Sequence, residues 1–404
     1  MAAAGEDDCP TEAMVAAIVS SAATTDEEKR QELVELVRLA APTQRRVAGV
    51  PLQRATAAQL AGAVRTMLPA VPADAYKAAE QRIVRAVRAG EPLADLVADA
   101  RCAASRKAHG LVELGEGRVG LEHLHGLVWF PGALSVSEQE YWVRRVLREL
   151  VEPPNARSCD GAGEAVERRL WARHCSGDGE ALGRVAWATL GVQYDWSRQT
   201  YPTLGDAGET GRFGAHATHR LCGDVAGWGV RAAAAAGFPA FVPEAGICNL
   251  YRSGKGRMGG HQDRSELTML APVVSMSLGC DGVFLVSAGP SRDAGPVVAL
   301  RLRSGDVLVM GGASRGCFHG VACVLEGTCP DALFRGRGGV EVGDGCGASA
   351  ALASASRRTG FVYEGVGDGC GARGEDAEEE LFREWVVRHR GNVNLRQVLP
   401  TTRR

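Results

Sequence analysis

Apolar residues in the first quarter of the chain recur at helical spacing. From about Thr11 to Ala108 the sequence is rich in Ala, Glu, Arg and Leu, and the runs at 32–37 and 81–87 repeat apolar positions every three or four residues. Several prolines and the breaker Gly90-Glu91-Pro92 interrupt the pattern, which indicates short helices instead of one coiled coil. We predict a helical N-terminal region over residues 1–115.

The pattern changes toward strands in the second half of the chain. An apolar run at 126–131 predicts a strand, and 135–150 has helix-start chemistry and amphipathic spacing. After Ala245 the apolar period becomes two in a series of short runs, at 247–251, 273–278, 283–286, 298–302 and 307–310. Such a series is typical of a jelly roll. We predict an α+β protein with a jelly-roll (double-stranded β-helix) core over residues 116–404.

One segment lacks either period. Between residues 323 and 380 glycine and small residues dominate, so we expect a largely disordered insertion at 335–373. The pattern returns in the helix expected at 381–387 and the strand expected at 390–396. Gly115 to Gly120 fits a GxGxxG spacing, but it lacks the preceding buried strand and the following helix of a dinucleotide fingerprint.

Composition limits the partners and the compartment. The 404 residues include 46 basic and 48 acidic ones, so any contact with nucleic acid must be local. Twelve cysteines without a CxxC pair favour reduced thiols inside a cell. The acidic start and the absence of an apolar run of ~20 residues predict an intracellular protein with no membrane partner. Nucleus, cytoplasm, mitochondrion and plastid all remain open, as does the oligomeric state.

A candidate metal site lies in the strand-rich half. His261 and Asp263 are two residues apart, so on an extended chain both side chains leave the same face and can reach one ion. His319 follows a strand pair and supplies a second imidazole. Two histidines and one carboxylate leave three metal positions open, which suits an iron(II) that must bind a co-substrate and oxygen.

The surrounding residues resemble the AlkB-type dioxygenases. The motifs that carry the resemblance occur in the family's order, namely 249–251, 261–266, 272–279, 304–310, 314–315, 319–321 and Arg390-x-Asn392-x-x-x-Arg396. The chain is similar in particular to the first-homologue branch of that family, through Asp-Arg-Ser-Glu at 263–266, Arg-Gln-Val-Leu at 396–399, and the segment 187–196.

The resemblance implies an Fe(II)- and 2-oxoglutarate-dependent dioxygenase domain over 116–404. It assigns Fe(II) to His261, Asp263 and His319, with 2-oxoglutarate and O2 as co-substrates. It gives the buried 2-oxoglutarate carboxylate to the guanidinium groups of Arg390 and Arg396, whose planar forks suit carboxylates. Hydrogen-bonding partners in the same site are Asn249, Tyr251 and Asn392. Asp306, Ser314 and Arg315 are expected to be structural, fixing the turn and loop that present His319.

The family's substrates imply where nucleic acid would bind. Members oxidise N-alkyl groups on nucleobases of RNA, including tRNA, or of DNA, and the oxidised alkyl group leaves as formaldehyde. Tyr194, Trp196 and Tyr201 form an aromatic cluster in the segment that covers the substrate in this family, although core packing explains such a cluster equally well. Exposed cations for phosphates are expected in the glycine-rich loop beside the ligands, at Arg252, Lys255, Arg257 and Arg264.

The most direct hypothesis is therefore an oxidative demethylase of nucleic acid. Two alternatives remain at this point. A 2-oxoglutarate-dependent hydroxylase acting on protein would keep the same metal residues, and a nucleic-acid-binding protein with vestigial catalysis would need a lost ligand. A basic and aromatic surface beside the metal is the feature that distinguishes the first hypothesis from protein hydroxylation.

Overall fold

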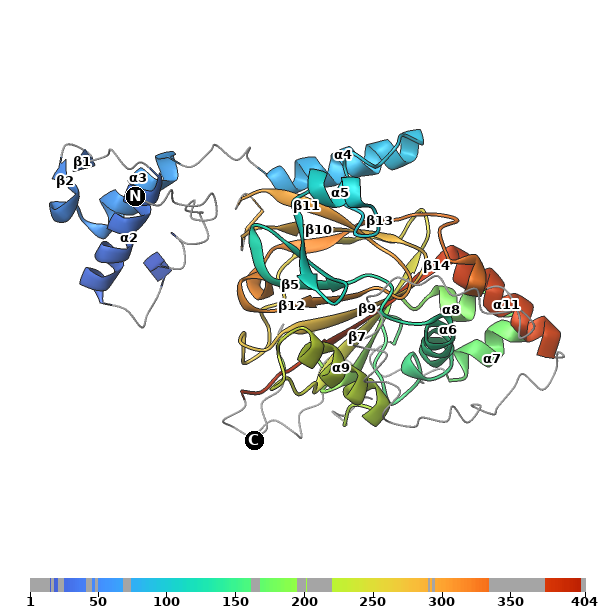
Figure 1. Cartoon of the computed structure of the whole chain (residues 1–404). Helices are drawn as coiled ribbons and strands as arrows, with labels where there is room; N and C mark the ends of the chain where they lie inside the picture. Colours follow the sequence, from blue (N-terminus) through green and yellow to red (C-terminus); the bar gives the residue numbers. More distant parts are fainter. Residues whose placement is uncertain are drawn as a thin grey trace.

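The computed structural model describes residues 15, 18–20, 25–40, 46–47, 50–67, 74–160, 168–194, 201, 220–289, 291–292, 295–333 and 375–400. Two β-sheets dominate this part of the chain (Figure 1). The larger sheet has eight described strands in the order β3-β4-β5-β12-β9-β14-β7-β6. Their bounds are β3 (Leu111–Gly115), β4 (Arg118–Leu121), β5 (Leu124–Phe130), β12 (Val307–Met310), β9 (Val273–Gly279), β14 (His389–Arg396), β7 (Ala245–Arg252) and β6 (Trp187–Gly191).

The smaller sheet has four described strands in the order β11-β10-β13-β8. Their bounds are β11 (Val297–Leu302), β10 (Gly282–Ser287), β13 (His319–Val324) and β8 (Met258–His261). The main hydrophobic core joins residues of both sheets, for example Val274 and Val309 from the larger and Val286 and Leu300 from the smaller. The predicted α+β class and jelly-roll core are confirmed.

Helices cover the sheets. Their bounds are α4 (Ala75–Ala89), α5 (Ala103–Ala108), α6 (Val136–Arg145), α7 (Leu170–Cys175), α8 (Glu180–Gly183), α9 (Gly223–Ala235) and α11 (Glu375–Arg388). Helices α6, α9 and α11 contact strands of the larger sheet, and α4 contacts the smaller one. Ser135 caps α6 in a capping box with Glu138, so the predicted helix start at 135 is confirmed. None of the described helices combines the length and apolar composition needed to cross a membrane.

The N-terminal region has two parts in the structure. Helices α2 (Asp26–Ala40) and α3 (Ala57–Met67), with the short strands β1 (Arg46–Val47) and β2 (Val50–Pro51), build a small core of their own around Leu33 and Leu60. Helix α4 instead packs Tyr76 and Ile83 against β10, β11 and β13. Part of the predicted N-terminal region therefore belongs to the packing of the smaller sheet.

The GxGxxG spacing at 115–120 is a hairpin turn. Gly115, Glu116 and Gly117 have φ values of 80°, 51° and 73°, and strands β3 and β4 pair on either side of them. Two-residue hairpin turns of this kind need positive φ, which glycine supplies at no steric cost. The predicted boundary at 115/116 lies inside this turn. The predicted insertion at 335–373 lies outside the described residues.

Candidate metal centre and co-substrate site

Strands β8 and β13 bring the two histidines together. His261 ends β8 and His319 begins β13, and the antiparallel register places them directly opposite one another. Their ring centroids are 4.5 Å apart. Asp263 follows β8 and contributes the third side chain, so that one ligand atom from each residue lies within 4.8 Å of the others.

The donor atoms surround one position. The Nε2 atoms of His261 and His319 lie 3.7 and 3.8 Å from the two oxygens of Asp263. His319 is buried, and the side chain of His261 is 35% exposed. This cluster is therefore closed by protein on the His319 side and open on the His261 side.

Backbone carbonyls fix both imidazoles in the same tautomer. The Nδ1 atoms of His261 and His319 lie 2.9 Å from the carbonyl oxygens of Gly259 and Cys317. A carbonyl oxygen only accepts, so each Nδ1 carries the proton and each Nε2 keeps its lone pair for a metal. This arrangement is the usual outer support of metal-binding histidines.

The electrostatics keep the ligands in their metal-binding forms. Burial lowers the pKa of His319 to about 4, because the cationic ring would lose its hydration. Burial alone would raise the pKa of Asp263, but the charge and hydrogen bond of Arg396, with a smaller contribution from the two neighbouring imidazoles, outweigh it and hold that pKa well below its usual range. The neutral imidazole of His319 and an ionised Asp263 are thus both present near neutral pH.

A buried ion-pair network holds the metal carboxylate. Arg396 donates from Nη2 to Asp263 Oδ2 at 2.7 Å, and its Nε lies 3.0 Å from Glu266 Oε1. Glu266 also accepts from Arg315 Nη2 at 2.8 Å. Arg315 donates further to the backbone carbonyls of Asp263 and Ala271. The loop 263–271 is therefore fixed at both ends by one guanidinium group.

Glu266 and Arg315 were not recognised as members of the site from the sequence. Arg315 was expected to be structural, and its contacts with Asp263 and Glu266 agree with that role. Both residues do occur in the quoted family motifs, at 263–266 and 314–315. Their pairing across 49 positions has no periodic signal, so only the fold connects them.

Strands β14 and β7 place the predicted 2-oxoglutarate residues on one face of the larger sheet. Arg390 lies opposite Tyr251, and Asn392 lies opposite Asn249. Since residues two apart on a strand share a face, these four and Arg396 line the same face. Asn392 donates from Nδ2 to Ser275 Oγ at 2.8 Å and to the Met276 carbonyl at 2.9 Å. Its amide nitrogen therefore secures strand β9.

Arg390 is a buried cation with neutral partners. It is 2% exposed and donates to the carbonyls of Cys280 and Leu302 at 3.2 and 3.1 Å and to Ser277 Oγ at 2.8 Å. Among the described residues, no ion pair is formed by its guanidinium, and its Nε is without a hydrogen-bond partner. Burial lowers the pKa of Arg390, partly opposed by Tyr251 and Asp281.

The two arginines occupy different ends of the site. They are six residues apart on β14, which corresponds to about 20 Å along the strand. Arg396 contacts Asp263, whereas Arg390 contacts Ser277 and the backbone of β11. The two arginines therefore have different partners within the protein, and a shared role in holding the 2-oxoglutarate carboxylate stays a prediction.

Most but not all of the predicted substrate residues lie within the described part of the chain. Tyr194 is half-buried, its hydroxyl lies 3.2 Å from Ser265 Oγ, and its ring packs edge-on against Tyr201 at 5.1 Å. Trp196 lies outside the described residues. Arg257 and Arg264 are exposed, as are the neighbouring Arg252 and Lys255. A partly aromatic and basic surface thus lies beside the metal ligands.

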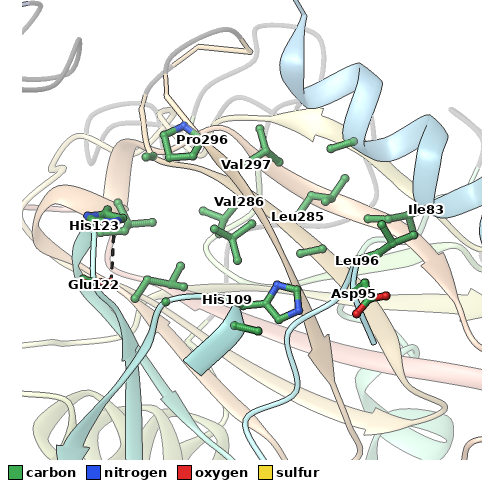
Figure 2. Close-up of a pocket in the computed structure, with 18 of the residues that line it drawn as sticks. Ile83, Asp95, Leu96, His109, Glu122, His123, Leu285, Val286, Pro296 and Val297 are labelled. Carbon is green, nitrogen blue, oxygen red and sulfur yellow. Dashed lines mark ion pairs between the residues drawn. The ribbon is translucent and has the colours of Figure 1, made fainter. Parts of the chain in front are cut away.

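A separate pocket lies away from these residues. Its volume is about 600 Å³, and Figure 2 shows the apolar side chains of Leu285, Val286 and Val297 and the imidazoles of His109 and His123 among the residues that line it. None of the three candidate ligands, nor Arg390 or Arg396, lines it. This pocket therefore contributes nothing to the candidate metal centre.

The residues present fit Fe(II) and 2-oxoglutarate. Two imidazole nitrogens and one carboxylate leave positions for a bidentate ligand and oxygen. Two buried guanidinium groups each retain a nitrogen without a partner in the described residues, Nε of Arg390 and Nη1 of Arg396. Buried polar atoms are normally satisfied, and the carboxylates of an anionic ligand would supply the missing acceptors.

Comparison with known proteins agrees with this chemistry. Residues 126–342 match the family model described as the 2OG-Fe(II) oxygenase superfamily. The chain is 28% identical over 242 residues to a DNA N(6)-methyladenine demethylase, ALKBH1A, of Arabidopsis thaliana, covering 51% of this chain and 66% of that protein. It is 31% identical to the nucleic acid dioxygenase ALKBH1 of Homo sapiens (51% and 52% covered) and 35% identical to the tRNA demethylase abh1 of Schizosaccharomyces pombe (37% and 45% covered).

The match covers only part of these relatives: the chain spans about two thirds of the Arabidopsis protein and about half of the human protein. The family model nevertheless covers more than half of this chain, including His261, Asp263 and His319. Members of that family use Fe(II), 2-oxoglutarate and O2. The chain belongs to the 2OG-Fe(II) oxygenase superfamily, and its curated relatives are AlkB homologues.

Proposed function

We propose that the protein is an Fe(II)- and 2-oxoglutarate-dependent demethylase of N-alkylated nucleobases in nucleic acid. The observation that carries the proposal is the joint placement of three metal donors and two buried guanidinium groups on facing strands. Bound iron supplies oxidation of the substrate alkyl carbon by O2, coupled to conversion of 2-oxoglutarate to succinate and CO2. The oxidised alkyl group then leaves as formaldehyde.

In this proposal the chain's own residues bind and orient. His261, Asp263 and His319 hold the metal, and Arg396 orients the carboxylate of Asp263 through a 2.7 Å hydrogen bond. Arg390 binds the far carboxylate of 2-oxoglutarate, with Tyr251 and Asn249 beside it on β7. A buried cation that lacks an internal carboxylate gains most from an anionic ligand, because the ligand supplies its missing counter-charge.

A nucleic-acid substrate is supported by the surface near the metal. Arg257 and Arg264 are exposed on the segments that flank His261 and Asp263, where they can contact phosphates. Tyr194 offers a partly exposed ring next to Ser265, on which a base can stack. On the same loop Leu270 is 91% exposed, an apolar side chain suited to contact with a base face.

The names of the relatives support the same substrate class. They include a DNA N(6)-methyladenine demethylase and a tRNA demethylase, and both names describe removal of a methyl group from nucleic acid. Because the similarity covers only part of those proteins, we propose the shared chemistry of the substrate and not one base or one kind of nucleic acid.

The proposal is tested by supplying Fe(II), 2-oxoglutarate and a panel of N-methylated RNA and DNA oligonucleotides. We expect succinate and formaldehyde in equal amounts with at least one methylated oligonucleotide, and no formaldehyde with its unmethylated counterpart. His319→Ala serves as the negative control. Succinate production that no oligonucleotide stimulates, but that a protein or peptide does, would contradict the nucleic-acid assignment and favour protein hydroxylation.

A further inference from the structure

A tyrosine of helix α4 lies directly behind the metal-bearing strands. Tyr76 is 1% exposed and belongs to the cluster on the outer side of the smaller sheet. Its ring packs edge-on against Phe318, with centroids 4.9 Å apart and planes at 87°. Phe318 immediately precedes His319, so the aromatic contact is one residue from a candidate metal ligand.

Glycines next to both histidines accommodate this ring. A Cβ atom at Gly260 would lie 2.6 Å from Tyr76 Cε1 and 2.2 Å from Phe318 Cε1. A Cβ atom at Gly320 would lie 2.6 Å from the Tyr76 hydroxyl oxygen. Gly260 precedes His261 and Gly320 follows His319, so only residues without a side chain leave room for Tyr76 at these two positions.

The same place is an irregularity in strand pairing. His319 pairs with His261, but Val321 pairs with Met258, so two residues of β8 oppose the single residue Gly320. A β-bulge of this kind redirects the neighbouring side chains and is common beside active sites. The bulge therefore decides how the two imidazoles face one another, and Tyr76 covers it from the outer side.

The start of α4 is attached to the neighbouring β10–β11 connection. The Tyr76 amide donates to the Arg292 carbonyl at 3.1 Å, and the Arg292 side chain lies 3.8 Å from Asp74, the residue that caps α4. The Arg292 guanidinium also lies over the Phe318 ring, 5.6 Å from its centroid. These contacts connect the start of α4, and with it Tyr76, to the segment that joins β10 and β11.

From these contacts we infer that Tyr76 is a positioning residue of the metal centre, which sets the spacing of His261 and His319 by filling the space behind the glycine bulge. The inference rests on the proposed metal site. Outer partners that hydrogen-bond to metal ligands typically change metal affinity by about 10- to 100-fold when removed, and we expect the packing support of Tyr76 to lie at the lower end of that range. The N-terminal helical region would then contribute to the centre although it supplies no ligand.

The test measures binding of Mn(II), which takes the place of Fe(II) without oxygen chemistry. The signal of free Mn(II) reports binding, and thermal unfolding of each variant is measured in parallel. We expect Tyr76→Ala to weaken Mn(II) binding about tenfold or more, and Tyr76→Phe, which keeps the ring, to remain within about twofold of wild type. If Tyr76→Ala does not fold, Tyr76→Leu replaces it with the same expectation, since leucine cannot reproduce the planar edge-on contact.

Ile83→Ala is the matched control. Ile83 lies on the same helix and in the same cluster, but it has no contact with Gly260 or Gly320 among those described. It should lower the unfolding temperature and leave Mn(II) affinity unchanged. Wild-type Mn(II) affinity in the Tyr76→Ala and Tyr76→Leu proteins, or an equal loss in Ile83→Ala, would overturn the inference. A wrong assignment of the metal site would give a different result, because His261→Ala would then leave Mn(II) binding unchanged.

Discussion

The two ends of strand β14 each hold a buried arginine, but only one of the two is paired with carboxylates. At one end Arg396 is 4% exposed and is paired with the carboxylates of Asp263 and Glu266. At the other end Arg390 is 2% exposed and contacts only carbonyl and hydroxyl oxygens. The first charge is neutralised within the protein, whereas the second remains available for a ligand.

We interpret this difference through the proposed role of each arginine. A carboxylate that binds a metal must stay ionised and keep a fixed orientation, and the hydrogen bond from Arg396 to Oδ2 of Asp263 favours both. A guanidinium that binds a dianionic co-substrate has to lack an internal partner, because an ion pair would compete with the ligand. Gly282 allows this arrangement, since a Cβ there would lie 2.7 Å from Arg390 Nε.

Removing Arg396 should have the largest effect. Arg396→Ala removes the arginine partner of Asp263 and one of the two arginines that pair with Glu266. Breaking a buried ion pair in this way typically costs about 3 to 5 kcal/mol. We expect a large fall in the free energy of unfolding, measured by denaturant titration, and weaker Mn(II) binding. Arg396→Lys keeps the charge but loses the planar fork, so both quantities should lie between those of wild type and alanine. A stability change below about 1 kcal/mol in Arg396→Ala would show that the network is not coupled to folding.

Replacing Arg390 should produce the opposite profile. Arg390→Met removes a buried, unpaired charge while keeping much of the volume, so the ligand-free protein should be as stable as wild type or more stable. Binding of 2-oxoglutarate to the Mn(II)-loaded protein should weaken roughly thirtyfold or more, the equivalent of at least about 2 kcal/mol. Calorimetric titration measures the affinity. A destabilised ligand-free protein with normal 2-oxoglutarate affinity would reverse the comparison between the two ends.

The exposed cation Arg257 should affect neither end of β14. Arg257→Ala is expected to leave 2-oxoglutarate affinity unchanged and to weaken oligonucleotide binding. The salt dependence of oligonucleotide binding should fall by the amount that corresponds to about one phosphate contact. Binding is measured at two or more salt concentrations. Arg54→Ala is the control, because Arg54 is an exposed arginine next to the core residues Leu52 and Ala55 of the N-terminal region. Equal losses in the two variants would argue against a local phosphate site.

The smallest effect concerns pH at the Arg390 end. His389 stacks on Trp385 at 4.5 Å and donates from Nδ1 to its carbonyl, and burial lowers the pKa of His389. In the unfolded chain a histidine has a pKa of about 6.5. As the pH falls below that value, His389 takes up a proton in the unfolded chain but not in the folded one. The contribution of His389 to stability, which is present at neutral pH, is therefore lost. His389→Phe should make the free energy of unfolding less dependent on pH between 7 and 5. An unchanged slope would assign the loss to other groups.

The sequence predicted those features that depend on local spacing. The period of two located strands β7, β9, β10, β11, β12 and β14 to within a few residues, because each has a buried face in a continuous core. The His-x-Asp spacing indicated two side chains on one side of the chain, and the structure brings them together with His319. The short strand β8 was not predicted, since Met258-Gly259-Gly260-His261 has no alternation to detect.

Long-range relations were not predictable in this way. Tyr76 lies in a segment assigned to a separate helical region, and its contact with Phe318 spans most of the chain. The sharing of Glu266 between Arg315 and Arg396 depends on three segments meeting in space. The different partners of Arg390 and Arg396 could be identified only from the fold, because the sequence shows two identical residues on one strand without their partners.

The most direct test of the central claim is calorimetric titration of 2-oxoglutarate into the protein with and without Mn(II), for wild type, His319→Ala and Arg390→Met. The account predicts tight binding only in the metal-loaded wild type, because the co-substrate needs the metal at one end and Arg390 at the other. Binding of equal strength in the metal-free wild type, or in metal-loaded His319→Ala, would contradict it.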